Sequence, residues 1–328
     1  MNLPKLTELD VSGKKVLLRL DLDTNPDPND LRIKASEETL NYLKDNGAEI
    51  IILAHKGRPS HEATEYKPIF DESLSLKPFQ SIFDKWNAKV EENLRFDPGE
   101  EGNDPEFVRR LADLGDIYVN EAFADSHREH ASIVGLPKLL PHAVGFRFEK
   151  EVENLSKVFG QPRRPVIFLL SGLKKDKLDY LPGLEKFCDK ILIGGRLPDY
   201  LGDEALESVR TQGEDQKEIV GNLVMDKEDI TLNTIERFEK EIKSAGTIVV
   251  SGPPGKFEEE GHRQGTERVF KAVVENKSAF KVAGGGDTEK AITLLQLSDK
   301  LDWVSVGGGA MLDFLVNKTL PGIEAMKN

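Results

Sequence analysis

The chain has 328 residues, of which 38 % are hydrophobic and 31 % charged, a balance typical of a globular protein with room for two domains. Its formal net charge of −13 argues against a nucleic-acid binder or a protein that docks on an anionic membrane, because both need a basic surface. Cys188 is the only cysteine, so no internal disulfide can form, and no apolar run approaches the length of a membrane span. We expect a cytoplasmic protein.

Strand-like and helix-like segments alternate along the chain, which is the pattern of parallel sheets flanked by helices. In the first half, the predicted strands are "KKVLLRLDL", "EIIILAH" and "DIYVNEAF". The predicted helices between them are "SEETLNYLKDNG", which Gly47 ends, and "PEFVRRLADLG", which has Pro105 in its first turn. A polar helical stretch, "FEKEVENLSKVFG", then leads into "QPRRP", which is the best domain boundary in the chain.

The second half restarts the alternation with five predicted strands, each of which ends in a turn that contains glycine: "VIFLLSG", "KILIGG", "TIVVSGPPG", "FKVAGGG" and "WVSVGGG". Ligands of open α/β sheets bind at the carboxyl ends of the strands, so this half is expected to carry a phosphate site of nucleotide size. The predicted fold is α/β, with two doubly wound parallel-sheet (Rossmann-like) lobes joined by a hinge helix.

The stretch "KVAGGGDTEKA" places Gly285, Gly286, Asp287 and Thr288 between a predicted strand and a predicted helix. Such a turn lets backbone N–H groups and the positive end of a helix approach a phosphate, and Asp287 would suit a magnesium ion bound to it. Neither a P-loop nor the dinucleotide fingerprint matches, since Glu289 stands where the fingerprint needs glycine or alanine. A tight turn without a ligand is the alternative interpretation.

Basic residues follow the predicted strands of the first half. Arg32, His55, Arg58, Arg95 and Arg128 would converge on one sheet edge, where guanidinium groups suit a ligand with phosphate and carboxylate groups, although each alone could be a solvated surface charge. The run "HREH" has no further ligand cluster near it, so we do not expect zinc. In "SGLKKDK", Lys174 and Lys177 could simply be exposed residues at the start of a predicted helix, but two lysines there indicate an anion, because the helix dipole disfavours cations.

In this order, the segments resemble the phosphoglycerate kinase family from about residue 14 to the C-terminus. The first half carries "LRLDLDTN", "AHKGRP" and "ENLRFDPGEEGNDPEF", and the second half carries "LLSGLKKDK", "SGPPGKFE", "GGGDT" and "GGGAMLDFLVNKTLPGIEAM". The resemblance implies reversible phosphoryl transfer between 1,3-bisphosphoglycerate and Mg-ADP, giving 3-phosphoglycerate and ATP, by a monomer whose lobes close about a hinge. It implies a phosphoglycerate-binding lobe over residues 1–155, to which the tail 318–328 returns, and a nucleotide-binding lobe over residues 156–317.

The resemblance also implies a role for each matching residue. On the acid side, Asp21 and Asp23 would bind the glycerate hydroxyl, and Arg32 would stabilise the transferring phosphoryl group. The carboxylate and phosphate would be held by His55, Arg58, Arg95 and Arg128. On the nucleotide side, Lys174 and Lys177 would steady the phosphates and act in catalysis, Glu258 would face the ribose, and Asp287 would bind Mg²⁺. The remaining implied nucleotide contacts are Gly285, Gly286, Thr288, Gly307, Gly308 and Gly309.

The chain departs from the family pattern mainly on the nucleotide side. Arg196 stands in place of a glycine where the adenosine pocket is expected, Ser251 replaces an asparagine, and Val306 replaces a threonine. Asp23 stands in place of an asparagine on the acid side. The chain is also several dozen residues shorter than is usual in the family. The missing length falls largely between residues 200 and 230, where a strand and nucleotide-side loops are expected, which predicts a smaller nucleotide lobe with an altered base pocket.

Two rival interpretations remain at this point. A phosphatase-type hydrolase is suggested by the strand followed by Asp-x-Asp in "VLLRLDLDTN", but Asn25 occupies a place where that motif needs threonine or valine. The other rival is a weakly active or non-catalytic relative that binds glycerate phosphates, which the changed base pocket favours. Arg32, Lys174, Lys177 and Asp287 argue against it, since a pure binder needs no transition-state cations.

Overall fold

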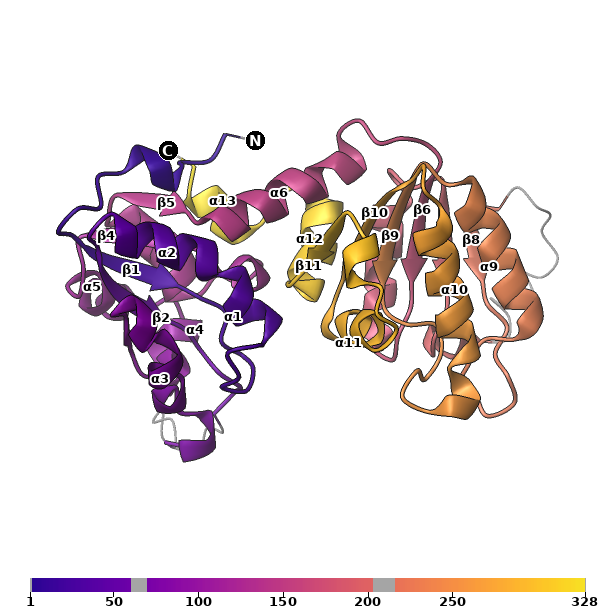
Figure 1. Cartoon of the computed structure of the whole chain (residues 1–328), viewed down its shortest axis with the longest axis horizontal. Helices are drawn as coiled ribbons and strands as arrows, with labels where there is room; N and C mark the ends of the chain where they lie inside the picture. The colour runs from indigo at the N-terminus through magenta and orange to yellow at the C-terminus, as the bar shows by residue number, and fades with distance from the viewer. Residues whose placement is uncertain (1, 60–69, 203–215, 328) are drawn as a thin grey trace. The chain divides into compact units, whose positions relative to one another are not determined.

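Two parallel sheets organise the chain in the computed structural model, which describes residues 2–59, 70–202 and 216–327 (Figure 1). The chain divides into one unit over Met1–Glu153 with Thr319–Asn328 and a second unit over Asn154–Lys318. Each unit has its own sheet with helices on it, so the predicted α/β class with two parallel-sheet lobes is confirmed. Within the part of the chain that is described, no helix is both long and apolar enough to cross a membrane.

The first unit has a five-stranded sheet in the order β3-β2-β1-β4-β5. Its central strands are mostly apolar because both of their faces are covered: Val16 and Leu18 pack in a core with α2, and Leu17 lies against Gly115 on the other face. The strands are β1 (Lys15–Arg19), β2 (Glu49–Leu53), β3 (Lys89–Val90), β4 (Ile117–Asn120) and β5 (His142–Val144). The helices are α1 (Leu31–Ala35), α2 (Glu37–Asp45), α3 (Gln80–Phe83), α4 (Pro98–Glu101), α5 (Pro105–Ala112) and α13 (Pro321–Ala325).

The second unit has a six-stranded sheet in the order β11-β10-β9-β6-β7-β8. Helices α9 and α10 pack on one face of it through apolar side chains at helical spacing, such as Ile235, Phe238 and Ile242 (Figure 1). The strands are β6 (Val166–Leu170), β7 (Lys190–Ile193), β8 (Glu218–Val220), β9 (Thr247–Ser251), β10 (Phe280–Gly284) and β11 (Trp303–Ser305). The helices are α7 (Leu181–Leu184), α9 (Leu232–Ser244), α10 (Gln264–Glu275), α11 (Gly286–Leu294) and α12 (Gly308–Asn317).

The strand orders place a topological switch point in each sheet. In the first unit the chain builds outward from β1 through β2 and β3 and then returns to add β4 on the other side of β1. In the second unit it builds from β6 through β7 and β8 and then adds β9 on the other side of β6. Loops diverge at such a point and leave a crevice at the carboxyl ends of the strands, where open α/β sheets bind ligands.

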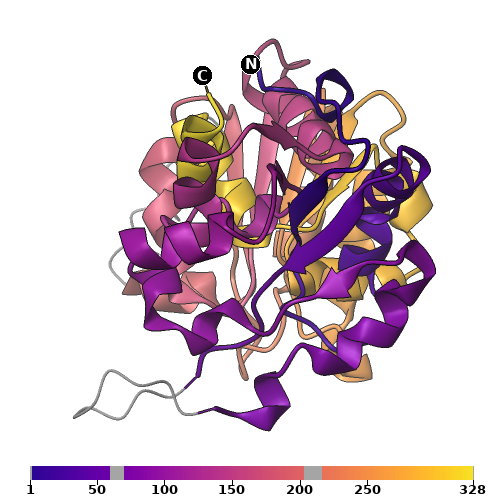
Figure 2. The ribbon, with the colours of Figure 1, turned by 90° about the vertical axis from the view of Figure 1, so that its left-hand side faces the viewer.

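The last helix, α13, packs on the first unit, although it follows the whole of the second unit in sequence (Figure 1, Figure 2). The backbone N–H of Gly322 donates to the Ser126 carbonyl at 2.9 Å, and a Cβ at Gly322 would meet the Ser126 side chain at 2.7 Å. Helix α6 (Phe146–Phe159) spans the boundary between the units. Its first turn is capped by the Glu121 carboxylate, which accepts from the N–H groups of Arg147 and Phe148 at 3.2 and 3.0 Å.

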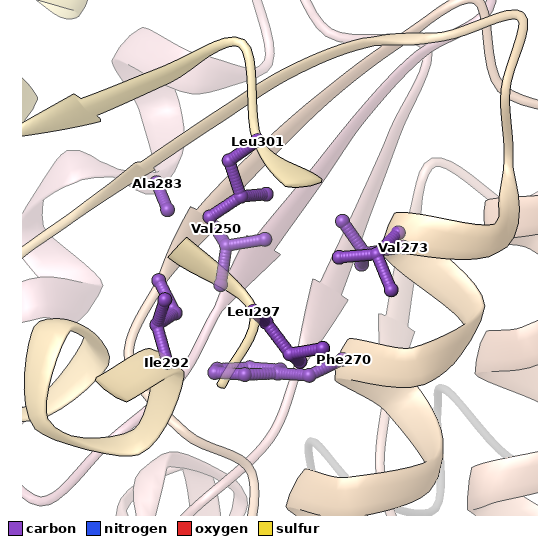
Figure 3. A pocket seen from close by; sticks show the side chains of 8 residues that line it. Val250, Phe270, Val273, Ala283, Ile292, Leu297 and Leu301 are labelled. Carbon is purple, nitrogen blue, oxygen red and sulfur yellow. The ribbon is translucent and has the colours of Figure 1, made fainter. Parts of the chain in front are cut away.

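A small apolar cavity lies in the core of the second unit, between the sheet and helix α10 (Figure 3). Side chains from β9, β10, α10 and α11 point into it, among them Val250, Ala283, Phe270 and Ile292. All the lining residues are apolar, and such cavities offer no partner to a nucleotide or even to water. The cavity is therefore a packing gap and not a candidate site.

Three strands are missed by the sequence pattern: β3, β5 and β8, which have only two or three residues each. Strand β8 lies inside the interval 200–230, where the shortened chain predicts the loss of a strand and loops. The structure corrects this expectation in part, because β8 pairs with β7 from Ile191 to Ile193. The expected loss of loops falls partly on residues 203–215, outside the described residues.

Candidate active site

Five of the predicted acid-side residues gather at the carboxyl ends of the strands of the first unit. Asp21 follows β1, His55 and Arg58 follow β2, and Arg128 follows β4, so that Asp21 and Arg128 flank the switch point between β1 and β4. Arg95 joins them from a short 3-10 helix (Leu94–Phe96) after β3. Arg95 is buried at 3 % exposure, whereas Arg58 is exposed.

A buried carboxylate, Asp125, organises these cations. Its oxygens lie 3.2 Å from Arg19 Nη2, 3.0 Å from Arg128 Nη1 and 3.6 Å from His55 Nε2. The Arg19 and Arg128 guanidinium groups hold the pKa of Asp125 below its usual range in spite of its burial. Neither Asp125 nor Arg19, which is completely buried, stands out in the sequence pattern.

His55 is buried between two arginines. Arg19 Nη2 lies 2.7 Å from its Nδ1, and Arg128 Nη1 lies 3.2 Å from its Nε2, which is also 3.6 Å from the Asp125 carboxylate. Burial lowers the pKa of His55 to about 2, and Arg19 and Arg95 add to this effect. The imidazole is therefore neutral at physiological pH, and it contributes hydrogen-bonding capacity and not charge.

The arginine cluster has donors that no described residue satisfies. Arg95 Nη1 donates to the Gly57 carbonyl at 2.7 Å, but its Nη2 is buried and has no hydrogen-bond partner among the described residues. Burial lowers the pKa of Arg95, and the nearby Arg128 guanidinium lowers it further. An anion beside Arg95 and Arg128 would satisfy the buried donor and relieve this repulsion.

Arg32 lies at the start of α1 beside the two predicted aspartates. Its Nη1 is 3.2 Å from Asp21 Oδ1 and donates to the Asp23 carbonyl at 2.5 Å. The Asp23 carboxylate accepts from the Gly57 N–H at 2.8 Å, which ties the β1 loop to the β2 loop. Burial and the Asp125 carboxylate raise the pKa of Asp21 to about 6, although Arg32 opposes the shift. Arg32 thus connects Asp21 and Asp23 in one polar cluster at the carboxyl ends of the strands of the first unit.

In the second unit, Lys177 bridges the switch point between β6 and β9. It comes from a 3-10 helix over Lys175–Tyr180, where the sequence predicts the opening of a helix. Its Nζ donates to the carbonyls of Ser171 and Ser251 at 2.7 and 3.1 Å. Burial lowers the pKa of Lys177 to about 8, although Asp287 raises it. The other predicted lysine, Lys174, is exposed.

The two glycine turns of the sequence pattern pack against each other. A Cβ on Gly308 would lie 2.5 Å from the Gly285 Cα, and Gly285 has a φ of +104°, so neither position accommodates a side chain. A Cβ on Gly286 or Gly309 would meet nothing within 4 Å, which leaves their backbones open to a ligand. Gly307 precedes this second turn as the residue before α12.

Thr288 and Asp287 differ in their surroundings. Thr288 is buried, and its hydroxyl accepts from the Gly252 N–H at 2.7 Å, so it fastens the loop after β9 to helix α11. Asp287 is exposed in the first turn of α11, where its carboxylate lies 3.6 Å from Lys290 Nζ. Asp287 and Glu258 both line a pocket over the carboxyl ends of β6, β7, β9 and β10. Arg196 lines the same pocket.

Comparison with known proteins identifies the family of this arrangement. The family model of phosphoglycerate kinase matches residues 6–201 and 199–318. The phosphoglycerate kinase of Dictyoglomus turgidum is 33 % identical over 387 aligned positions, which cover 98 % of each chain. That of Herpetosiphon aurantiacus is 33 % identical over 394 positions and the full length of both chains. The solved structure of phosphoglycerate kinase from Coxiella burnetii is 28 % identical, with a TM-score of 0.82 over 99 % of both chains.

The fold and these matches define an α/β phosphotransferase with two parallel-sheet units, a kinase. The chain belongs to the phosphoglycerate kinase family. The resemblance that rests on its motifs is thereby confirmed over the whole chain.

Proposed function

We propose that this protein transfers a phosphoryl group reversibly between the acyl phosphate of 1,3-bisphosphoglycerate and ADP, giving 3-phosphoglycerate and ATP, so that a carboxyl group is the acceptor in the reverse direction. The observation that carries this proposal is the pair of switch points, one lined by a cluster of arginines and the other by a lysine and open glycine turns. Phosphoryl transfer needs positioning and charge neutralisation more than a base, and these residues supply both.

On the acid side, Arg58, Arg95 and Arg128 would bind the carboxylate and phosphate of the glycerate. The unsatisfied Nη2 of Arg95 supports this role, and the neutral His55 would add a hydrogen bond. Asp21 and Asp23 would hold the hydroxyl group. Arg32 would leave its contact with Asp21 to meet the negative charge of the phosphoryl group in flight.

On the nucleotide side, Lys177 and Lys174 would neutralise the phosphates and the transferring group. Backbone N–H groups of the glycine turns would approach the phosphates, and Glu258 would bind the ribose. The glycine contacts are those at Gly285, Gly286, Gly307, Gly308 and Gly309. Thr288 would act by fixing the geometry of the turn, since its hydroxyl already holds the loop after β9.

Asp287 would bind the magnesium ion that accompanies the nucleotide. No group of three or more acidic, histidine or cysteine side chains forms a ready-made metal site in the described ranges. The single carboxylate of Asp287 fits Mg²⁺, because this ion is usually held by one or two carboxylates together with the substrate phosphates. When bound, the ion would neutralise the charge of the phosphates.

We expect a cytoplasmic monomer that acts in glycolysis or gluconeogenesis and closes about α6 during catalysis. The net charge of −13 supports the absence of nucleic-acid and membrane partners.

The direct test is steady-state phosphoryl transfer from MgATP to 3-phosphoglycerate, with Lys177→Ala as the control variant. Turnover that collapses in the variant would support the proposed reaction and the role of Lys177. A folded protein that binds 3-phosphoglycerate but shows no turnover with any nucleotide would contradict it in favour of the non-catalytic alternative.

A pH profile tests the state of Lys177 separately. Its ammonium form should be needed for phosphate binding, and its pKa of about 8 lies well below the ordinary value of 10.5. We therefore expect kcat/KM for the nucleotide to fall as pH rises through about 8, where the free enzyme loses this proton. In Lys177→Arg, which stays charged, the residual activity should not fall in this range. A wild-type profile that is flat up to pH 9 would contradict the assignment.

A further inference from the structure

The pocket of the second unit has a charged end that its proposed phosphate chemistry does not use. Arg196 and Glu228 both line this pocket, and Arg196 Nη1 lies 3.5 Å from Glu228 Oε1. Arg196 follows β7, and its backbone N–H donates to the Gly172 carbonyl at 2.9 Å, which fixes the start of its side chain over the β6 loop. The inference below rests on the proposed function, because it concerns the nucleotide of that reaction.

The position of the pair along the sheet indicates which part of a nucleotide it would meet. Asp287 and the open glycine turn follow β10, whereas Arg196 follows β7, three strands away in the sheet order. Three strand spacings amount to about 14 Å. With the phosphates at the β10 end, the ribose and base extend along the pocket past Glu258 toward β7. The base therefore reaches Arg196 and Glu228.

Both side chains have hydrogen-bonding capacity to spare. The guanidinium of Arg196 makes only long contacts, at 3.4 Å to Asp199 and 3.5 Å to Glu228, and its Nε is buried without a partner among the described residues. Among the described residues, the Glu228 carboxylate contacts the side chains of Arg196, at 3.5 Å, and Lys256, whose Nζ lies 3.9 Å away. Contacts this long contribute little as hydrogen bonds. A ligand can thus engage both groups without breaking a strong interaction.

Guanine matches this pair better than adenine does. A guanidinium fork donates to two adjacent acceptors, and guanine offers O6 and N7, whereas adenine has a donor, its N6 amino group, beside N7. A carboxylate accepts from two adjacent donors, and guanine offers N1–H and the 2-amino group, a pair that adenine lacks. We propose that Arg196 and Glu228 read the base of the nucleotide and that this protein prefers guanine to adenine nucleotides.

The test is equilibrium binding of Mg-GDP, Mg-IDP and Mg-ADP by titration calorimetry, which needs no turnover. We expect GDP to bind on the order of tenfold or more tightly than ADP, since one bidentate pair discriminates by about that factor. Inosine keeps O6, N7 and N1–H but lacks the 2-amino group, so IDP should lie between the two. Glu228→Gln should bring GDP and IDP to similar affinity, whereas Arg196→Leu should weaken both toward the affinity of ADP.

Arg268→Ala is a matched control. Arg268 pairs with Glu239 on helices α9 and α10 of the same unit, and the exposed fractions of that pair, 34 % and 29 %, resemble the 32 % and 28 % of Arg196 and Glu228. Its substitution should leave the order of the three nucleotides unchanged. Wild-type protein that binds ADP as tightly as GDP would overturn the inference. So would a guanine preference that survives in both Arg196→Leu and Glu228→Gln.

The outcome is separable from that of the proposed function. Absence of phosphoryl transfer with both MgATP and MgGTP would contradict the proposed reaction, while a GDP preference that the variants abolish would still support the base-reading pair. Transfer with MgATP at equal or higher kcat/KM than with MgGTP would overturn the inference and leave the reaction in place.

Discussion

Arg19→Leu is expected to lower the free energy of unfolding of the first unit by about 3–5 kcal/mol, the cost of breaking a buried ion pair on one side. Arg19 is completely buried, and its Nη2 lies 3.2 Å from Asp125, which is only 5 % exposed. Its Nε donates to the Ser132 hydroxyl at 2.9 Å, and this hydroxyl donates to the buried Glu100 carboxylate. The substitution therefore removes a buried counter-charge from one buried carboxylate and a hydrogen bond from the network of a second.

The measurement is urea unfolding followed by tryptophan fluorescence. Trp86 lies in the first unit and Trp303 in the second, so a Trp303→Phe background reports on the first unit alone. Arg110→Leu is the control, because Arg110 pairs with Asp97 at the surface of the same unit, where an ion pair contributes about 1 kcal/mol or less. Equal losses in the two variants would contradict the assigned role of Arg19. If Arg19→Leu does not fold, Ser132→Ala provides the milder test, with an expected loss of about 1–3 kcal/mol.

The fold of this protein is readable from sequence because its parallel strands are buried on both faces. Runs such as 50–54 and 166–170 are continuously apolar, and each is followed by a turn with a polar or glycine residue. The edge strands β3, β5 and β8 escape the pattern because two or three residues do not show a period.

The site residues fall into two groups, those that can be found from sequence and those that cannot. Arg32, Arg58 and Lys177 can be found from sequence since each is a cation just after a predicted strand. Arg19 lies inside β1 among apolar residues, so the sequence pattern predicts a strand there but no functional role for this residue. Its partner Asp125 lies more than a hundred residues further along the chain. A pair of this kind is defined by strand order, which the sequence pattern does not specify.

Arg196 and Glu228 illustrate the same limit on the nucleotide side. The sequence marks Arg196 as a departure from a glycine-rich turn, yet it offers no reason to connect it with a glutamate more than thirty positions away. The loop after β8 brings Glu228 to the pocket, and the backbone N–H of Lys256 donates to its carbonyl at 2.8 Å. Arg196 and Glu228 become neighbours only in the folded chain.

Arg32→Ala is expected to lower kcat about 10²–10³-fold, equivalent to about 2.7–4 kcal/mol of barrier, as when one donor to a developing oxyanion is removed. In the structure Arg32 Nη1 contacts Asp21 and the Asp23 carbonyl, while its side chain is 29 % exposed, so it has access to a phosphoryl group on the solvent side. Binding of 3-phosphoglycerate should remain largely intact, because the proposed contacts to its carboxylate and phosphate come from Arg58, Arg95 and Arg128.

Two comparisons separate this role from a structural one. Lys34→Ala removes a cation from the exposed side of the same helix, α1, and should leave kcat within about twofold if net charge is not the cause. Arg32→Lys keeps the charge without the planar fork and should recover only part of the loss. Calorimetric titration of 3-phosphoglycerate completes the test. Unchanged turnover in Arg32→Ala would remove Arg32 from the catalytic group, whereas lost turnover together with lost 3-phosphoglycerate binding would make it a binding residue.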